Sequence, residues 1–171
     1  MEPPSRKRTK GPGRRIAKEL VEFNKEVEAK LVAARATVPD ATKEDVSEMT
    51  IETVGDDLMH LKVTFNGPMD TIWAGHAYEL DVSIPGTYPI DPPKIKFVRP
   101  IFHCNVYSSG AICLDTLQSK WAGSLTIAQV TRTIMLLMQD PNKSSPANVD
   151  ASSMMKTAGQ WEARVKANPF I

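Results

Sequence analysis

The sequence predicts an α+β fold: an N-terminal helix, a four-stranded antiparallel meander, a long irregular segment, a central helix and two C-terminal helices. Three observations support this prediction. Apolar residues recur at helical spacing near the start of the chain, their period changes to two in the middle, and a second helical stripe follows an N-cap residue near the end. Periods of about 3.6 and 2 are typical of amphipathic helices and of half-buried strands.

The first helix is expected to follow a basic lead. Residues 1–13 are rich in proline, glycine, lysine and arginine, a composition typical of a disordered tail. We therefore divide the chain into a disordered basic tail, 1–13, and one domain, 14–171. From Arg14 onward one helical face, ending before Pro39, carries apolar residues: Ile16, Leu20, Phe23, Val27 and Leu31. A polar linker, 40–45, is expected next.

Alternating apolar and polar residues predict the sheet. Residues 59–65 alternate in this way and lead into the turn Asn66-Gly67-Pro68. Residues 78–84 and 95–97 repeat the alternation, and a weaker strand, 49–54, comes first. Strands with one apolar face that are joined by short turns favour an antiparallel meander.

The segment from Pro100 to Ser124 shows no sustained period. Long irregular segments inside compact domains tend to be functional. After it, Thr126 is expected to cap a helix that ends at Pro141. The buried face of this helix is predicted to hold Ile127, Val130, Ile134 and Met138. Two shorter helices, around 149–157 and 160–168, are expected to close the chain.

Length and composition exclude several classes of protein. A chain of 171 residues with 42% hydrophobic and 24% charged residues fits one globular domain, and a net charge of +1 gives no general attraction to nucleic acid or membranes. The longest apolar run, 134–138, is far shorter than the roughly 20 residues of a membrane span.

No secretory signal is evident, so we expect free thiols and a cytoplasmic location. The basic tail is interpreted as a solvated segment, a nuclear targeting signal or a docking site for an acidic partner.

The chemistry has few candidate residues: two cysteines, three histidines and scattered carboxylates. No pair has the spacing of a metal site and no glycine-rich phosphate loop is present, so we expect neither a metal nor a bound cofactor. Cys113 follows Ser108-Ser109-Gly110, a turn that can present a side chain. Cys104 neighbours His103, but adjacent residues in an extended chain point to opposite sides and form no dyad.

Several motifs around Cys113 resemble those of the ubiquitin-conjugating enzyme family. The similarity extends from Arg14 to the C-terminus and lies in the order and spacing of its motifs. These are Tyr88-Pro-Ile-Asp-Pro-Pro-Lys-Ile-Lys-Phe97, Phe102-His-Cys-Asn-Val106, Gly110-Ala-Ile-Cys-Leu-Asp115 and Trp121. The family fold, called the UBC fold, has the same order of elements as the one predicted above.

The resemblance implies a role for each site residue. Cys113 would accept ubiquitin as a thioester, because a thiolate is a good nucleophile and a good leaving group. Asn105 would donate to the oxyanion, and His103 would support its loop. Asp115 would lie near the incoming lysine, or be a solvated loop carboxylate. Ser145 stands where many members have an aspartate that gates the acceptor lysine.

The resemblance also implies partners: ubiquitin, an activating enzyme that uses ATP upstream, ubiquitin ligases, with the RING type favoured, and substrate proteins. The activating enzyme would contact the start of the first helix, and ligases would contact that helix and two loops; the alternative is a solvated face. These surfaces comprise Arg14, Arg15 and Lys18 for the activating enzyme, and Arg15, Ile90, Ala122, Gly123 and Ser124 for ligases. Many partners favour phenylalanine at the position of Ile90.

Departures from the family pattern leave the subfamily open. The family usually has proline where this chain has Cys104, and some peroxisomal members share this His-Cys-Asn, so peroxisomal association is one expectation. Residues 145–152 resemble both the cell-cycle type and the type that serves degradation at the endoplasmic reticulum. The insertions typical of the SUMO carrier and of the cell-cycle type are missing, which favours ubiquitin as the modifier.

Three rival functions remain at this point. A cysteine hydrolase would need His60 or His76 as a base beside Cys113. A domain that binds ubiquitin without carrying it would lack the cysteine. A nucleic-acid binder would need aromatic residues among the basic ones of the tail, and the tail has none.

Overall fold

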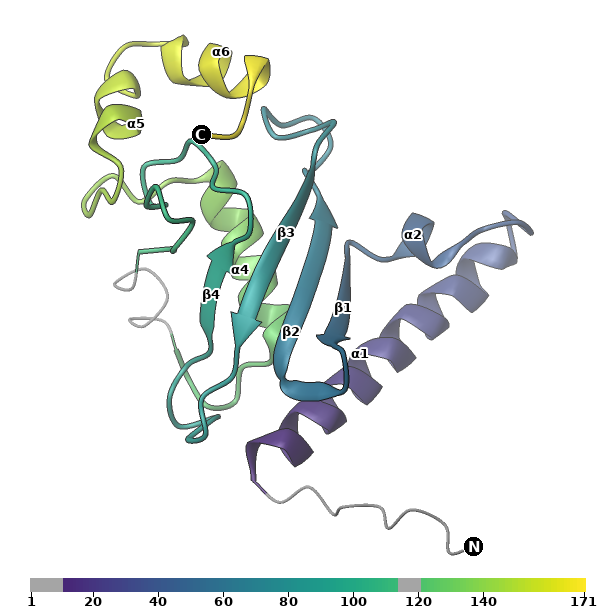
Figure 1. Cartoon of the computed structure of the whole chain (residues 1–171). Helices are drawn as coiled ribbons and strands as arrows, with labels where there is room; N and C mark the ends of the chain where they lie inside the picture. Colours follow the sequence, from purple (N-terminus) through teal and green to yellow (C-terminus); the bar gives the residue numbers. More distant parts are fainter. Residues whose placement is uncertain (1–10, 114–120) are drawn as a thin grey trace, which may run out of the picture.

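The computed structural model describes residues 11–113 and 121–171, and it confirms the α+β fold (Figure 1). Four strands form one antiparallel sheet in the order β1-β2-β3-β4, the predicted meander. Helix α4 crosses one face of this sheet, α1 lies beyond its β1 edge, and α5 and α6 lie at the end where the chain finishes. No helix in the described residues has the length and apolar character that a membrane span requires.

Helix α1, Pro12–Arg35, begins two residues earlier than predicted. Proline suits the first turn of a helix, where its missing N–H has no intrahelical partner in any case. Gly13 therefore belongs to the helix and not to the lead. Leu20 of the predicted apolar stripe is partly buried and packs against the core, and the adjacent Glu19 is also among the buried residues of α1.

A four-residue helix, α2, Lys43–Val46, begins within the predicted polar linker and ends one residue beyond it. Thr42 caps it, since the Thr42 N–H and hydroxyl both donate to Asp45 Oδ2 at 2.8 Å. A threonine followed three residues later by an acidic residue resembles a capping box, although the acidic member is usually a glutamate. The polar composition of 40–45 thus reflects helix capping as well as exposure to solvent.

The sheet strands are β1, Met49–Val54, β2, Asp57–Asn66, β3, Ala77–Ser83, and β4, Lys94–Phe97. Their register places Val63 opposite Leu80, and Leu80 opposite Phe97, so that the inward side chains of neighbouring strands meet. The outward face is charged. Lys62 pairs with Glu52 across β1 and β2, and Asp81 pairs with Lys96 and with His60.

Helix α4, Ile127–Gln139, begins at the predicted cap, where the Thr126 hydroxyl accepts from Gln129 N. Its buried face includes Ile127, Val130, Ile134 and Met138, as predicted. The carbonyl of Met138 accepts a 2.8 Å hydrogen bond from the indole of Trp73, whose side chain is completely buried. The end of α4 is therefore held to the core by apolar packing and by a hydrogen bond to its backbone.

The last two helices tie the chain end to the irregular segment. Helix α5, Val149–Met154, is shorter than predicted, and α6 spans Gln160–Ala167. The Trp161 indole donates to Phe102 O at 3.2 Å, and Phe102 N donates to Pro169 O at 2.7 Å. These bonds hold the residues just before His103 in place.

Gly110 allows the irregular segment to pack against β4, and it yields a testable prediction. Its φ is +84°, and a Cβ added there would lie 2.1 Å from the carbonyl oxygen of Phe97. Gly75 has a φ of +83° but open space around it, so it is the matched control. We expect Gly75→Ala to lower the free energy of unfolding by about 1–2 kcal/mol, the cost of a left-handed backbone.

Gly110→Ala is expected to cost more than that, because it adds a steric clash with the backbone of β4. Urea unfolding of both variants measures the difference. Equal losses of stability in the two variants would show that the contact between Gly110 and Phe97 does not constrain the fold.

Candidate active site

Cys113 lies at the end of a backbone turn that begins at Asn105. The Cys113 N–H donates to Asn105 O at 2.9 Å, and Val106 and Ile112 form an antiparallel bridge inside that pair. Tyr107 N donates to Ala111 O, and Gly110 N donates back to Tyr107 O, both at 2.9 Å. The turn thus brings Cys113 beside Asn105, although eight positions separate them in the sequence.

Cys113 is 5% exposed, and its thiol faces the loop between α4 and α5. Its Sγ lies 3.8 Å from the Ser145 hydroxyl. The structure therefore brings together two residues proposed from the sequence, Cys113 and Ser145, the candidate gate for the acceptor lysine. Asp115, the third proposed residue of this group, lies outside the described residues.

Asn105 is completely buried, and its side-chain amide fastens the 142–145 loop. Its Nδ2 donates to Asn142 O at 2.7 Å and to Ser145 O at 3.2 Å, while its Oδ1 accepts from Asn142 N at 2.8 Å. Both amide hydrogens are thus engaged with backbone carbonyls. An oxyanion could take a hydrogen bond from Asn105 only if one of these two bonds were released.

His103 is buried between two elements and bonds both of them. Its Nδ1 accepts from Asn105 N at 3.1 Å, and its Nε2 donates to Leu137 O near the end of α4 at 3.0 Å. The ring also packs against the indoles of Trp73 and Trp161. Burial lowers the pKa of His103 to about 4, so the imidazole is neutral at physiological pH.

Cys104 has a different environment from Cys113. It is completely buried, and burial raises the pKa of its thiol above the ordinary value. Its Sγ lies 3.4 Å from Asn105 Oδ1, and its carbonyl accepts from Ala147 N at 2.6 Å and from Asn148 N at 2.9 Å. A protonated thiol enclosed in this way is a poor nucleophile, because the thiolate is the reactive form.

The other two histidines lie in contacts of their own. His60 pairs with Asp81 on the outward face of the sheet, and the ring of His76 packs against Phe170. These contacts do not orient either ring as a base for Cys113, which weakens the hydrolase alternative. In the part of the chain that the structure describes, no group of three or more histidine, cysteine or acidic residues could hold a metal ion.

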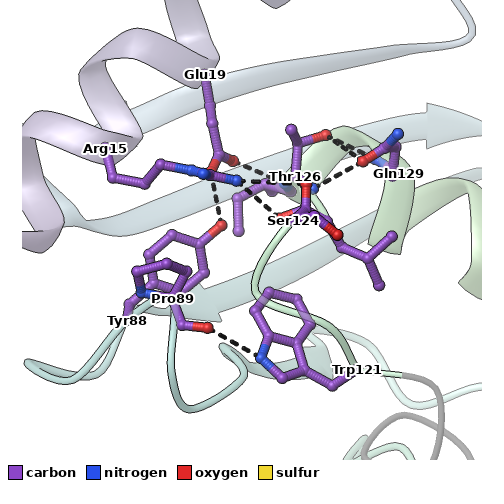
Figure 2. A network of polar contacts seen from close by, with 10 residues as sticks. Arg15, Glu19, Tyr88, Pro89, Trp121, Ser124, Thr126 and Gln129 are labelled. Atoms are coloured by element: carbon purple, nitrogen blue, oxygen red, sulfur yellow. Dashed lines mark hydrogen bonds and ion pairs between the residues drawn. The ribbon is translucent and has the colours of Figure 1, made fainter.

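Two of the proposed docking residues, Arg15 and Ser124, lie side by side near the starts of α1 and α4 (Figure 2). Arg14, Lys18 and Ile90 are exposed, Ile90 at 81%, and so is the loop 122–124. Arg15 is less free than expected. Its guanidinium donates to Glu19 at 2.5 Å and to the carbonyls of Ser124 and Leu125 at 3.5 and 3.3 Å.

Glu19 is the residue of this region that sequence reasoning missed. Its side chain lies among the buried residues of α1, three positions after Ile16 and four before Phe23. A carboxylate at core spacing on an otherwise apolar face was the available signal, because an acidic residue is rarely buried without partners. The partners are Arg15, Tyr88 and the backbone of Ile127.

Comparison with known proteins identifies relatives of this chain. A family model described as ubiquitin-conjugating enzyme matches residues 22–168. Among solved structures, the chain is similar to the E2 domain of a Toxoplasma gondii ubiquitin conjugating enzyme, with 29% sequence identity and a TM-score of 0.71. That match covers 90% of this chain and 93% of the other.

His103 predicts a pH dependence of stability. The folded state disfavours its protonated form, with a pKa of about 4 against an ordinary 6.5. Between these values the unfolded chain binds a proton that the folded chain does not. The free energy of unfolding therefore falls as the pH drops from 6.5 toward 4, and this group has no such effect above 6.5. The full contribution is about 3 kcal/mol at roughly 1.4 kcal/mol per pH unit.

The measurement compares urea unfolding of the parent and His103→Gln at pH 7 and at pH 4.5. We expect the variant to be less stable at pH 7 but to lose about 2–3 kcal/mol less between the two pH values. Carboxylates with lowered pKa values, such as Glu26 and Asp81, titrate in both proteins and cancel in the comparison. Parallel losses in parent and variant would contradict a neutral, buried His103.

Proposed function

The chain belongs to the ubiquitin-conjugating enzyme family, and from this premise we propose that it carries ubiquitin as a thioester on Cys113 and transfers it to a substrate lysine. The observation that supports Cys113 most strongly is its setting. The cysteine closes a turn whose other end is Asn105, and its thiol lies beside Ser145. Cys104, in contrast, is enclosed by Asn105 and by the 142–148 loop.

Two acyl transfers make up the proposed reaction. In the first, the Cys113 thiolate attacks the thioester that joins ubiquitin to the activating enzyme, whose thiol leaves. In the second, a lysine amine attacks the new thioester, a C–N bond forms, the C–S bond breaks and Cys113 is released as thiolate. No cofactor on this chain takes part. ATP is consumed upstream by the activating enzyme.

Asn105 has a part in both structure and chemistry in this proposal. Its amide holds the 142–145 loop, and the same amide is the candidate donor to the oxyanion of the second step. The bond to Ser145 O, at 3.2 Å, is the longer of its two donor bonds and is the one we expect to be exchanged. One donor of this kind contributes roughly 2.7–4 kcal/mol to lowering a barrier in acyl transfer.

The proposed partners use the surface around α1. Arg14, Arg15 and Lys18 would contact the activating enzyme, while Ile90 and the loop 122–124 would contact RING-type ligases. The exposure of Ile90 and of the loop supports this assignment. Asp115 stays a proposed contact of the incoming lysine. Cytoplasmic, nuclear and peroxisomal locations likewise stay expectations from the sequence.

The assignment of the acceptor is tested by substituting each cysteine. With ATP, activating enzyme and ubiquitin, Cys104→Ala is expected to form an adduct that thiol removes, because Cys113 is intact. Cys113→Ser is expected to form at most an oxyester that survives thiol. Gels with and without reductant show the difference. A thiol-sensitive adduct on Cys113→Ser would place the acceptor elsewhere.

The same preparation distinguishes a carrier from a hydrolase. A fluorescent ubiquitin ester is turned over by a hydrolase, whereas a carrier leaves it intact. We expect no turnover by the parent chain. Steady release of the fluorophore that disappears in Cys113→Ala would favour the hydrolase.

Ser145 provides a prediction about the second step. At neutral pH only about one lysine in 10³ is a free amine, so a carboxylate that orients the ammonium as it loses its proton assists attack. Ser145 can orient the lysine but brings no charge. Starting from the preformed thioester, Ser145→Asp is expected to discharge to free lysine about three- to tenfold faster, the effect of roughly 1 kcal/mol.

Ser145→Ala is the matched control, because it removes the hydroxyl without adding charge, and no gain is expected from it. Charging is measured separately, since a carboxylate beside the Cys113 sulfur disfavours the thiolate. If Ser145→Asp discharges no faster than the parent between pH 7 and pH 9, this residue does not gate the lysine.

A further inference from the structure

Glu19 is a buried carboxylate with three hydrogen-bond donors around it (Figure 2). Its side chain is 7% exposed. Oε1 accepts from Arg15 Nε at 2.5 Å and from the Tyr88 hydroxyl at 2.7 Å, and Oε2 accepts from Ile127 N at 2.9 Å. Both carboxylate oxygens are therefore used, which is what a charge at this depth requires.

The three donors come from three separate segments of the chain. Arg15 lies in the first turns of α1, Tyr88 lies in the loop between β3 and β4, and Ile127 is the first residue of α4. The sequence separations from Glu19 to Tyr88 and to Ile127 are 69 and 108 residues. A single carboxylate thus joins the start of α1, the Tyr88–Ile90 loop and the start of α4.

Other bonds connect the same three segments around Glu19. The guanidinium of Arg15 also reaches the carbonyls of Ser124 and Leu125. The Trp121 indole donates to Pro89 O at 3.1 Å and to Ile90 O at 3.2 Å. Gly123 lies so close that an added Cβ would be 3.0 Å from Pro89 O. Of these connections, only those through Glu19 are made by a charged group that is nearly enclosed.

The outer side of each joined segment is exposed. Ile90 follows Tyr88 by two residues, the loop 122–124 precedes Ile127, and Arg14 and Lys18 flank Arg15 and Glu19. Exposed side chains of this kind add little to folding stability. A partner that contacts all three segments binds well only when these side chains have the correct positions relative to one another.

We propose that Glu19 is a positioning residue that holds the start of α1, the Tyr88–Ile90 loop and the 121–127 segment in one arrangement, so that partners meet a single preformed docking surface. This inference rests on the proposed function for the identity of those partners. Stability alone is a weak reason to bury such a group, since buried ion pairs are often no more stabilising than apolar residues of similar size. A preformed surface lowers the entropic cost of ordering its loops and side chains when a partner binds, provided that they are held in the bound arrangement.

The test compares Glu19→Gln with the parent, using activating enzyme preloaded with ubiquitin as the probe. Glutamine keeps the size of the side chain, but its amide nitrogen cannot accept, so at least one of the three donors loses its partner. We expect the KM for loaded activating enzyme to rise about tenfold, the effect of roughly 1.4 kcal/mol of lost binding. Discharge of the preformed thioester to free lysine is expected to stay within about twofold, because Glu19 bonds the start of α4 whereas the residues around Cys113 are bonded to its other end.

A spectroscopic signal separates positioning from simple loss of stability. The Trp121 ring packs against Tyr88 with ring centroids 5.8 Å apart, and its indole reports how the 121–127 segment lies on the Pro89–Ile90 loop. We expect Glu19→Gln to shift the Trp121 indole N–H resonance and to speed its exchange with solvent, while the indole resonances of Trp73 and Trp161 stay in place. Tyr88→Phe removes one bond to Glu19, and smaller changes in the same direction are expected.

Thr131→Val is the matched control for stability. Thr131 is completely buried in α4, and its hydroxyl bonds Ile127 O within the same helix, so its loss weakens the fold without separating the three segments. We expect a lower melting temperature with an unchanged KM and an unchanged Trp121 signal. If Glu19→Gln and Tyr88→Phe lower the melting temperature as Thr131→Val does but change neither KM nor the Trp121 signal, Glu19 is not a positioning residue.

Failure of the proposed function has a different outcome. If the parent chain itself accepted no ubiquitin, the carrier assignment would fail, whereas the Trp121 signal would still report on the three segments. A parent that charges normally, together with a Glu19→Gln variant that charges with the same KM, overturns only the role of Glu19.

Discussion

Helix α4 is bonded at both ends by buried polar side chains, and the geometry of both functional regions depends on these bonds. At its start, the Ile127 N–H donates to Glu19, and near its end the carbonyls of Leu137 and Met138 accept from His103 and Trp73. The first N–H groups and last carbonyls of a helix have no partner inside the helix, so buried helix ends need such groups. A carboxylate at the N-terminus also interacts favourably with the helix dipole.

The same helix therefore connects the two regions. His103, at its far end, bonds Asn105, whose carbonyl holds Cys113 and whose amide holds the 142–145 loop. Glu19, at its near end, bonds the loop that carries Ile90. A packed helix between two sets of buried hydrogen bonds is a rigid spacer, since interiors at this density deform little. The distance between the proposed docking surface and the Cys113 thiol is consequently fixed by the core.

Much of this fold could be predicted from the sequence, because its periodic elements are half buried. The alternation in 59–65 and the stripe of α4 give one face to the core and one to solvent, and the structure has both as predicted. The burial of Glu19 in α1 was not predicted, because hydropathy alone favours the adjacent Leu20 for the core. Glu19 is tolerated in the interior because Arg15 in the same helix, together with Tyr88 and Ile127 from distant parts of the sequence, donates to its carboxylate.

The residues of the candidate site could be predicted from the sequence, but the hydrogen bonds that connect them could not. Sequence motifs indicated Cys113, Asn105 and Ser145, but not that one carbonyl of Asn105 would hold the cysteine while its amide held the loop of the serine. Cys104 illustrates the point. Its thiol is enclosed, with Sγ 3.4 Å from Asn105 Oδ1 and 3.9 Å from Asn142 O. The carbonyl of Cys104, which a proline would also have, makes the two bonds to Ala147 and Asn148. These bonds are made by the main chain of Cys104, so the identity of its side chain could not indicate that position 104 anchors the residues before α5.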